Sequence, residues 1–144
     1  MQYKKNDNKI YLSMDKNEYI NASLLKVCKE NNAKFAWING IGAIFDIEVG
    51  YFDIETKDYK KKIFNEDFEL VSLSGNMTYK DGEPFIHTHI SFSDSEFNVF
   101  GGHLFDCKIA AAGEFVITID DADCSKVSRT YNEDIGLFLW NCKI

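Results

Sequence analysis

The sequence predicts an α+β fold in which β-strands predominate and a single helix accompanies them. Three observations support this fold class. Most apolar segments alternate apolar and polar residues as half-buried strands do, only one segment has helical spacing, and 15% of the 144 residues are aromatic. The length fits one compact domain, so we expect residues 1–144 to form a single domain.

The N-terminal part of the chain is expected to supply the first strand and the helix. Lys9–Met14 alternates as a strand does, and Asp15 followed by Glu18 forms a capping pair. Between Glu18 and Asn32 the apolar residues fall on one stripe at helical spacing, with lysines and a glutamate on the other side. A helix is therefore predicted to begin at the capping pair and to end at Asn31-Asn32.

The middle of the chain has the pattern of a strand meander. Its expected strands are Phe35–Asn39, Ile44–Ile54, Asp58–Phe64 and Phe68–Tyr79. Gly40-Ile-Gly42 predicts a tight turn or a bulge, because it has neither the third glycine nor the Gly-Lys-Ser/Thr ending of the phosphate-binding motifs. Asp81-Gly82 predicts a hairpin turn that folds the next strand back against Phe68–Tyr79.

The C-terminal part is expected to complete the sheet. Its predicted strands are Val99–Phe105, Cys107–Ile119 and Ile135–Trp140, and Ser91–Asn98 is polar and turn-like. Asp120, Asp121 and Asp123 are expected to lie in a surface loop, because the calcium-loop spacing with its glycine and glutamate is missing.

All three histidines of the protein fall between residues 87 and 103. His87 and His89 are two residues apart in an expected strand, so both side chains point to one face of the sheet. His103 follows Gly101-Gly102, a pair that permits a close approach of the backbone and that brings a third imidazole within reach. Three imidazoles with an open fourth position suit a zinc ion. The alternative is that the histidines are half-buried residues held by hydrogen bonds.

A catalytic site at such a metal also needs a general base. Glu69, Glu83 and Glu114 are the candidates, and the sequence gives no geometry with which to choose among them. Glu114 interrupts an otherwise apolar strand, so it is either a solvated position or a carboxylate that orients a histidine ring. Ser72, Ser74 and Asn76 share one face of their strand, but the register that would relate this face to the histidines is not fixed by the sequence.

The charge of the chain argues against a nucleic-acid partner. The formal net charge is −7, and Arg129 is the one arginine among 16 basic residues, which leaves little capacity for bidentate contacts to phosphate or guanine. Lys57 and Lys60–Lys62 form a basic cluster that is expected to be the exposed edge of a strand.

The cysteines and the apolar runs indicate where in the cell the protein is expected. Four cysteines without a Cys-x-x-Cys pair, and an N-terminus without an apolar signal core, predict a cytoplasmic protein with reduced thiols. Ile135–Trp140 and the other uncharged apolar runs are far shorter than the roughly 20 residues of a membrane span, so no membrane association is expected.

A set of short motifs runs along the chain in a specific order. They are Ile38-Asn-Gly-Ile-Gly-Ala43, Gly50-Tyr-Phe-Asp53, Phe68-Glu-Leu-Val-Ser-Leu-Ser-Gly-Asn76, Asp81-Gly-Glu-Pro84, His87-x-His89, Gly101-Gly-His-Leu104 and Glu114. In these motifs the chain resembles the plant and prokaryote conserved (PPC) domain family over nearly its full length. The resemblance implies a strongly curved, mostly antiparallel sheet with a packed helix, assembled as a homotrimer. It also implies a metal bound by histidines at the positions of His87, His89 and His103, as in prokaryotic members.

Plant members of that family often lack these histidines, so the fold is not expected to need the metal. They carry the domain beside an AT-hook, which is impossible here because Arg129 precedes Thr130 and Pro84 is the only proline. A cupin is a minor alternative fold. The residue types of the cupin motif occur here as Gly82, His87, His89, Glu96 and Gly101, but the number of residues between them differs from the motif at three places.

Two functions remain open. The first is a homotrimer that binds zinc or another divalent metal through the three histidines, with a small-molecule or catalytic site at the metal. The alternative is a non-enzymatic protein-interaction module in which the metal is structural or absent.

Overall fold

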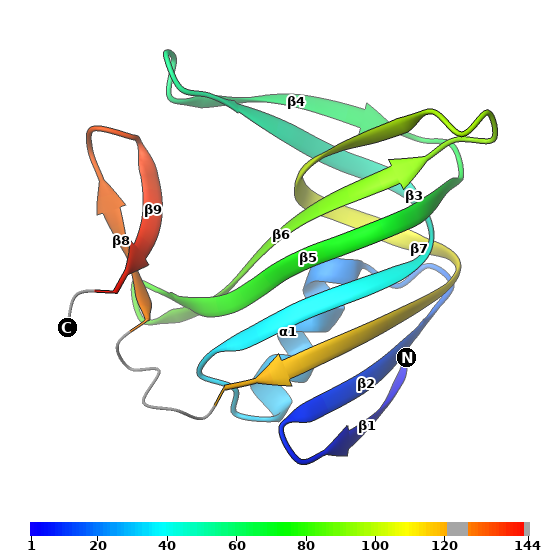
Figure 1. Cartoon of the computed structure of the whole chain (residues 1–144), viewed down its shortest axis with the longest axis horizontal. Coiled ribbons are helices and arrows are strands. Elements are labelled where there is room, and N and C mark those ends of the chain that lie inside the picture. Colours follow the sequence, from blue (N-terminus) through cyan, green and yellow to red (C-terminus); the bar gives the residue numbers. More distant parts are fainter. Residues whose placement is uncertain (121–126, 143–144) are drawn as a thin grey trace.

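The computed structural model describes residues 1–120 and 127–142. One nine-stranded sheet with one helix packed against it makes up this part of the chain (Figure 1). The elements in order are β1 (Gln2–Asn6), β2 (Lys9–Asp15), α1 (Ile20–Glu30), β3 (Ala36–Asp53), β4 (Asp58–Phe64), β5 (Phe68–Lys80), β6 (Glu83–Ser93), β7 (Val99–Ile119), β8 (Ser128–Asn132) and β9 (Leu137–Asn141). Among these strands the β5–β8 pairing alone is parallel, so the prediction of a mostly antiparallel sheet with one helix is confirmed.

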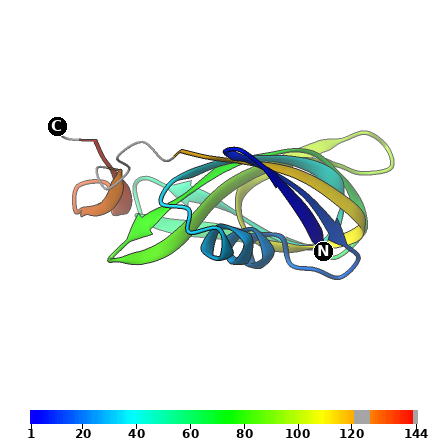
Figure 2. The same ribbon diagram turned by 90° about the horizontal axis from the view of Figure 1, so that it is seen from below.

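The sheet curves back on itself. Strand β3 pairs with β5, β5 with β6, β6 with β7, and β7 again with β3, so these four strands form a closed cycle of pairings. Figure 2 shows the resulting curvature, with α1 below the strands. Bulges in β3 and β7 make the curvature possible, because an extra residue bends a strand without ending it.

Two strands are longer than the sequence predicted. Strand β3 covers both predicted strands, Phe35–Asn39 and Ile44–Ile54, except for Phe35 and Ile54. Gly40–Gly42 forms a bulge within this continuous strand. Strand β7 likewise joins the two strands that were expected on either side of residue 106. The bulge alternative at Gly40–Gly42 is therefore confirmed, and the division into separate strands is wrong, since the irregular positions lie inside continuous pairings.

Helix α1 begins later than the capping pair suggested. The backbone N–H of Asp15 does donate to the Glu18 carboxylate at 2.7 Å, but this bond closes a turn ahead of the helix. Asn17 and Glu18 are instead tied to β7 through two backbone hydrogen bonds with Ile109, at 2.8 and 3.0 Å. The helix therefore starts only at Ile20, and it ends at Glu30 with Asn31 as its C-cap, as expected.

The first turn of α1 is capped from another strand. Tyr19 occupies the N-cap position without a side-chain capping bond. Asp106 of β7 takes that role, because its Oδ1 accepts the backbone N–H of Asn21 at 3.0 Å. The side chain of Asn21 donates in turn to the carbonyl oxygens of Leu104 and Phe105. These bonds fix the start of the helix against the strand that carries His103.

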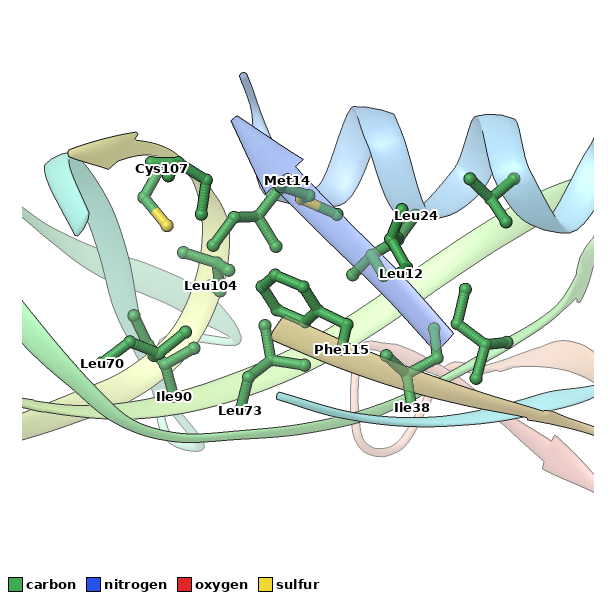
Figure 3. Close-up of a cluster of buried hydrophobic side chains, with 14 of the residues drawn as sticks. Leu12, Met14, Leu24, Ile38, Leu70, Leu73, Ile90, Leu104, Cys107 and Phe115 are labelled. Carbon is green, nitrogen blue, oxygen red and sulfur yellow. The ribbon is translucent and has the colours of Figure 1, made fainter. Parts of the chain in front are cut away.

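The core lies between the inner face of the curved sheet and the apolar side of α1. Figure 3 shows Leu12 and Met14 of β2, Leu24 of α1, and Leu104 and Phe115 of β7 converging there. Alternate residues of β2 are buried, so Tyr11 points to the opposite, outer face.

The sequence missed two strands at the ends of the chain. Strand β1 is polar and exposed at every position, and β8 is too short and mixed to give an alternating signal. Strand β9 lies within two residues of its predicted bounds, while Asp121 and Asp123 fall outside the described residues. Strand β4, with Lys60–Lys62, is the expected exposed edge. In the described residues no helix is long and apolar enough to cross a membrane.

Candidate metal centre

The turn between β5 and β6 sets the position of two histidines. Asp81 and Gly82 both have left-handed backbone conformations, with φ of 53° and 82°, as a two-residue hairpin turn requires. Counting outward from this turn pairs Asn76 with His87 and Ser74 with His89. Directly opposed residues of an antiparallel pair share a face. The polar face of β5 is therefore the histidine face, which answers the question that the sequence left open.

The third histidine comes from β7, which lies between β6 and β3 at this point. His103 is directly opposite His89. The two preceding glycines permit the approach, because a Cβ at Gly101 would lie 2.6 Å from the Ile90 carbonyl oxygen and one at Gly102 would lie 2.9 Å from that of Gly50. The glycine pair thus brings the third imidazole to the other two, as expected.

The three rings form a compact cluster of nitrogen ligands. One ring nitrogen from each of His87, His89 and His103 lies within 4.8 Å of the other two. The Nε2 atoms of His87 and His89 are 3.2 Å apart, close to the separation of about 3.3 Å that tetrahedral zinc imposes on two of its nitrogen ligands. Nδ1 of His103 is buried without a hydrogen-bond partner among the described residues. A buried nitrogen of this kind gains most from an ion, so the donor set fits a divalent metal.

The surroundings keep the rings neutral. Burial first, and then the positive charge of Arg129 and the neighbouring His103 and His89, together lower the pKa of His87 to about 4. Burial, then His89 and Arg129, lower the pKa of His103 to about 4. Burial also lowers the pKa of His89. Neutral imidazole is the form that binds metals, so the site is in its ligating state at pH 7.

Arg129 is a member of the site that sequence reasoning missed. Its buried guanidinium donates to Thr78 Oγ1 and Asn76 Oδ1, both at 2.9 Å, and to the Phe138 carbonyl oxygen at 3.1 Å. It also lies 3.2 Å from Nδ1 of His87. The sequence offered one signal, since this is the only arginine in the chain.

The contact between Arg129 and His87 has a consequence for metal binding. A guanidinium can only donate, so Nδ1 of His87 accepts, and the proton of the neutral ring is on Nε2. A metal bound at Nε2 would require the ring proton to be on Nδ1. Arg129 would then lose its contact with His87, while Thr78, Asn76 and Phe138 would remain as its partners.

The histidine cluster opens into a cavity of about 980 Å³. Its walls come from β3 and β4, the β8–β9 hairpin, the first turns of α1, and the strands that carry the histidines. The ring of Tyr59 packs on His103, with centroids 5.0 Å apart, and Phe105 packs on the same histidine at 5.1 Å. Asp106 is the one carboxylate among the lining residues, and burial raises its pKa although backbone N–H groups of α1 and Cys107 bind it.

The predicted general bases lie elsewhere. Glu69 is opposite Ser93, Glu83 is opposite Lys80, and Glu114 is an exposed residue opposite Ser13. None of the three lines the histidine cavity. Glu114 therefore occupies the solvated position that was one of its two alternatives, and it does not orient a histidine ring.

The cupin alternative is wrong. Glu96, which that motif needs beside the histidines, lies in the exposed turn between β6 and β7. Its backbone N–H donates to Asp94 at 2.9 Å, and it is not among the cavity residues.

Comparisons with known proteins agree with the motifs and the fold. The chain is similar in structure to a putative DNA-binding protein from Bacteroides thetaiotaomicron, with 35% identity, a TM-score of 0.90, and coverage of 96% of this chain and 95% of that one. A plant- and prokaryote-conserved protein from Pyrococcus horikoshii gives 33% identity, a TM-score of 0.83, and coverage of 96% and 92%. A protein from Archaeoglobus fulgidus that is described as metal-containing gives 33% identity, a TM-score of 0.82, and coverage of 96% of both chains. No curated protein matches the chain.

The family profile extends over most of the sequence. The Plants and Prokaryotes Conserved (PCC) domain matches residues 1–120, which include the three histidines and end before β8. The chain therefore belongs to the Plants and Prokaryotes Conserved domain family.

Proposed function

We propose that the protein binds one divalent metal ion per chain, zinc, through His87, His89 and His103. The cavity beside the histidines then receives a small molecule at the open position of the metal. The observation that carries the proposal is the convergence of three neutral ring nitrogens within 4.8 Å. Imidazole nitrogen is a preferred zinc ligand, and three such ligands leave one position for water or a ligand oxygen. The similarity to a metal-containing protein from Archaeoglobus fulgidus supports the proposal.

The proposal specifies binding at the metal and no particular reaction. A zinc ion in such a site can polarise a carbonyl group or lower the pKa of a bound water. A reaction would also need a proton acceptor. Among the described residues, Asp106 is the only carboxylate in the cavity lining, and its Oδ1 is already occupied by the N–H groups of Asn21 and Cys107. The chain's own residues thus favour a ligand-binding site.

A zinc titration tests the proposal and its pH dependence. We expect untagged, chelator-treated protein to bind one equivalent of zinc per chain at pH 7. Because the pKa values of His87 and His103 lie near 4 in the folded protein, protons should begin to displace zinc only as the pH approaches 5, and not near the ordinary histidine value of 6.5. The unfolded chain, however, takes up protons below about 6.5, so the metal-free protein should lose stability as the pH falls from there towards 4.

Calorimetric zinc titrations at pH 7, 6 and 5, each with a chelator competitor, measure this dependence. Absence of a stoichiometric zinc site at pH 7 would contradict the proposed function. A loss of affinity of about 30-fold between pH 7 and 6, the value for three histidines with the ordinary pKa of about 6.5, would show that burial does not protect the rings.

We further propose that the protein assembles as a homotrimer. Support comes from the outer face of the sheet, where large apolar side chains are exposed. Their exposed fractions are 49% for Tyr11 of β2, 42% and 54% for Trp37 and Ile41 of β3, and 50% for Val71 of β5. An apolar face of this kind usually marks an interface. Light scattering at micromolar concentration should give a mass near three times 16.5 kDa, and a monomeric mass would contradict the proposal.

Duplex DNA and membranes are not part of the proposal. A net charge of −7 and a single arginine disfavour the replacement of phosphate counterions on which DNA affinity depends. That arginine is buried and bound to Thr78, Asn76 and Phe138. We place the protein in the cytoplasm, which is supported by free thiols at Cys28, Cys107 and Cys142.

A further inference from the structure

We propose that the histidine cavity takes a monoanionic organic acid with an aromatic or other apolar body, and that Lys80 receives its carboxylate. The inference names the ligand class of the site and rests on the proposed function in so far as the metal faces the same cavity. The contact with Lys80 can be tested with and without metal.

The charged side chains that line the cavity favour an anionic ligand. Lys80 and Arg129 are its two cations, and neither forms an ion pair within residues 1–120 and 127–142. Asp106 is the only carboxylate in the part of the lining that the structure describes, and it is bound to the N-terminus of α1. In the metal-free protein, two cations and one carboxylate among the described lining residues leave a single positive charge, which matches a monoanion, and a bound divalent metal would add to this positive charge.

Lys80 is the cation that remains available to a ligand. The guanidinium of Arg129 is buried and directed at four neutral groups, so it contributes its charge to the cavity but is held by the protein. The half-buried Lys80 instead lies over aromatic rings, with Nζ 4.0 Å from the ring centre of Phe138 and 5.5 Å from that of Phe85. A carboxylate at this ammonium group would complete an ion pair beside rings that already exclude much of the water.

The rest of the lining suits an apolar body. On one wall Phe52, Tyr59 and Phe105 pack edge to face, with Tyr59 at 5.2 and 5.3 Å from the other two rings. The opposite wall carries Phe85 and the apolar side chains of β9. A volume of about 980 Å³ lies within the range of pockets that enclose a small organic molecule. An acid bound at Lys80 would therefore extend its body between the two aromatic walls.

Calorimetry with 4-phenylbutyrate and its neutral analogue 4-phenylbutyramide tests the inference. Both ligands are titrated into metal-free and zinc-loaded protein. We expect the acid to bind about tenfold more tightly than the amide, because only the acid forms the ion pair. Lys80→Met should remove this difference by weakening the acid about tenfold while leaving the amide and the zinc stoichiometry unchanged.

Lys62→Met is the matched control. Lys62 also lies over a ring, with Nζ 4.5 Å from the centre of Phe64, but it is exposed and does not line the cavity. This variant should bind the acid as the unaltered protein does. Equal affinity for acid and amide, an unchanged acid affinity in Lys80→Met, or no binding in either metal state would overturn the inference. Zinc stoichiometry, measured on the same samples, reports separately on the proposed metal site.

Discussion

His89→Ala should lower the affinity for zinc by at least about 100-fold, because loss of a residue that merely orients a metal ligand already costs about 10- to 100-fold. His89 contacts both other members of the cluster, with its Nε2 3.2 Å from that of His87 and its backbone directly opposite His103. Two remaining imidazoles cannot complete the three-nitrogen face of a tetrahedral ion. Competition titration against a chelator of known affinity measures the change.

The same substitution should leave the fold intact. His89 is exposed on the outer face of the sheet and contributes nothing to the apolar core, so the thermal midpoint of the metal-free variant should stay close to that of the unaltered protein. Tyr59→Phe is the matched control, since it keeps the ring that packs on His103 and supplies no ligand in either form. Unchanged zinc affinity in His89→Ala would show that the histidine cluster is not the metal site.

The histidine set could be predicted from the sequence because it depends on local rules. Side-chain alternation puts His87 and His89 on one face, whatever the partner strands are. The register was left open by the sequence, because a bulge between the turn and the histidines would have changed it. In the structure the two-residue Asp81-Gly82 turn pairs Asn76 with His87, and the first irregularity in this pairing comes beyond Ser72.

The environment of the cluster could not be predicted in the same way. Arg129 reaches His87 across 42 residues and belongs to β8, which gives only a weak strand signal. Its position depends on a two-residue parallel contact between β5 and β8, for which no local pattern exists. Glu114 had two alternatives from the sequence, a solvated position or a carboxylate that orients a histidine ring. Strand alternation places it on the solvated face.

The late start of α1 has a similar cause. The capping pair at Asp15 and Glu18 forms the expected hydrogen bond, but tertiary bonds from Ile109 hold the intervening backbone out of helical conformation. Asp106 then caps the helix from a distant strand. Local signals thus gave the elements and their faces, while contacts between distant residues decided where the elements begin and what surrounds the site.

Arg129→Met should destabilise the attachment of the β8–β9 hairpin by about 3 kcal/mol. Methionine keeps most of the apolar stem but donates no hydrogen bond, so Thr78 Oγ1, Asn76 Oδ1 and the Phe138 carbonyl oxygen lose a partner. Thr78 and Asn76 are buried, and water cannot replace the guanidinium there without opening the hairpin. The β5–β8 pairing that remains comprises only two residue pairs.

Native-state hydrogen exchange measures this effect where it arises. Amides of β8 and β9 should exchange about 100-fold faster in Arg129→Met, since each 1.4 kcal/mol is a factor of ten, while amides in the β3–β7 pairing should keep their protection. Arg129→Lys should recover only part of the loss, because one ammonium group cannot reach three acceptors in different directions. Both variants should still bind one zinc per chain, since Arg129 supplies no ligand and its positive charge opposes the binding of a cation. Unchanged exchange in β8 and β9 would mean that apolar packing, and not the buried arginine, holds the hairpin against the histidine site.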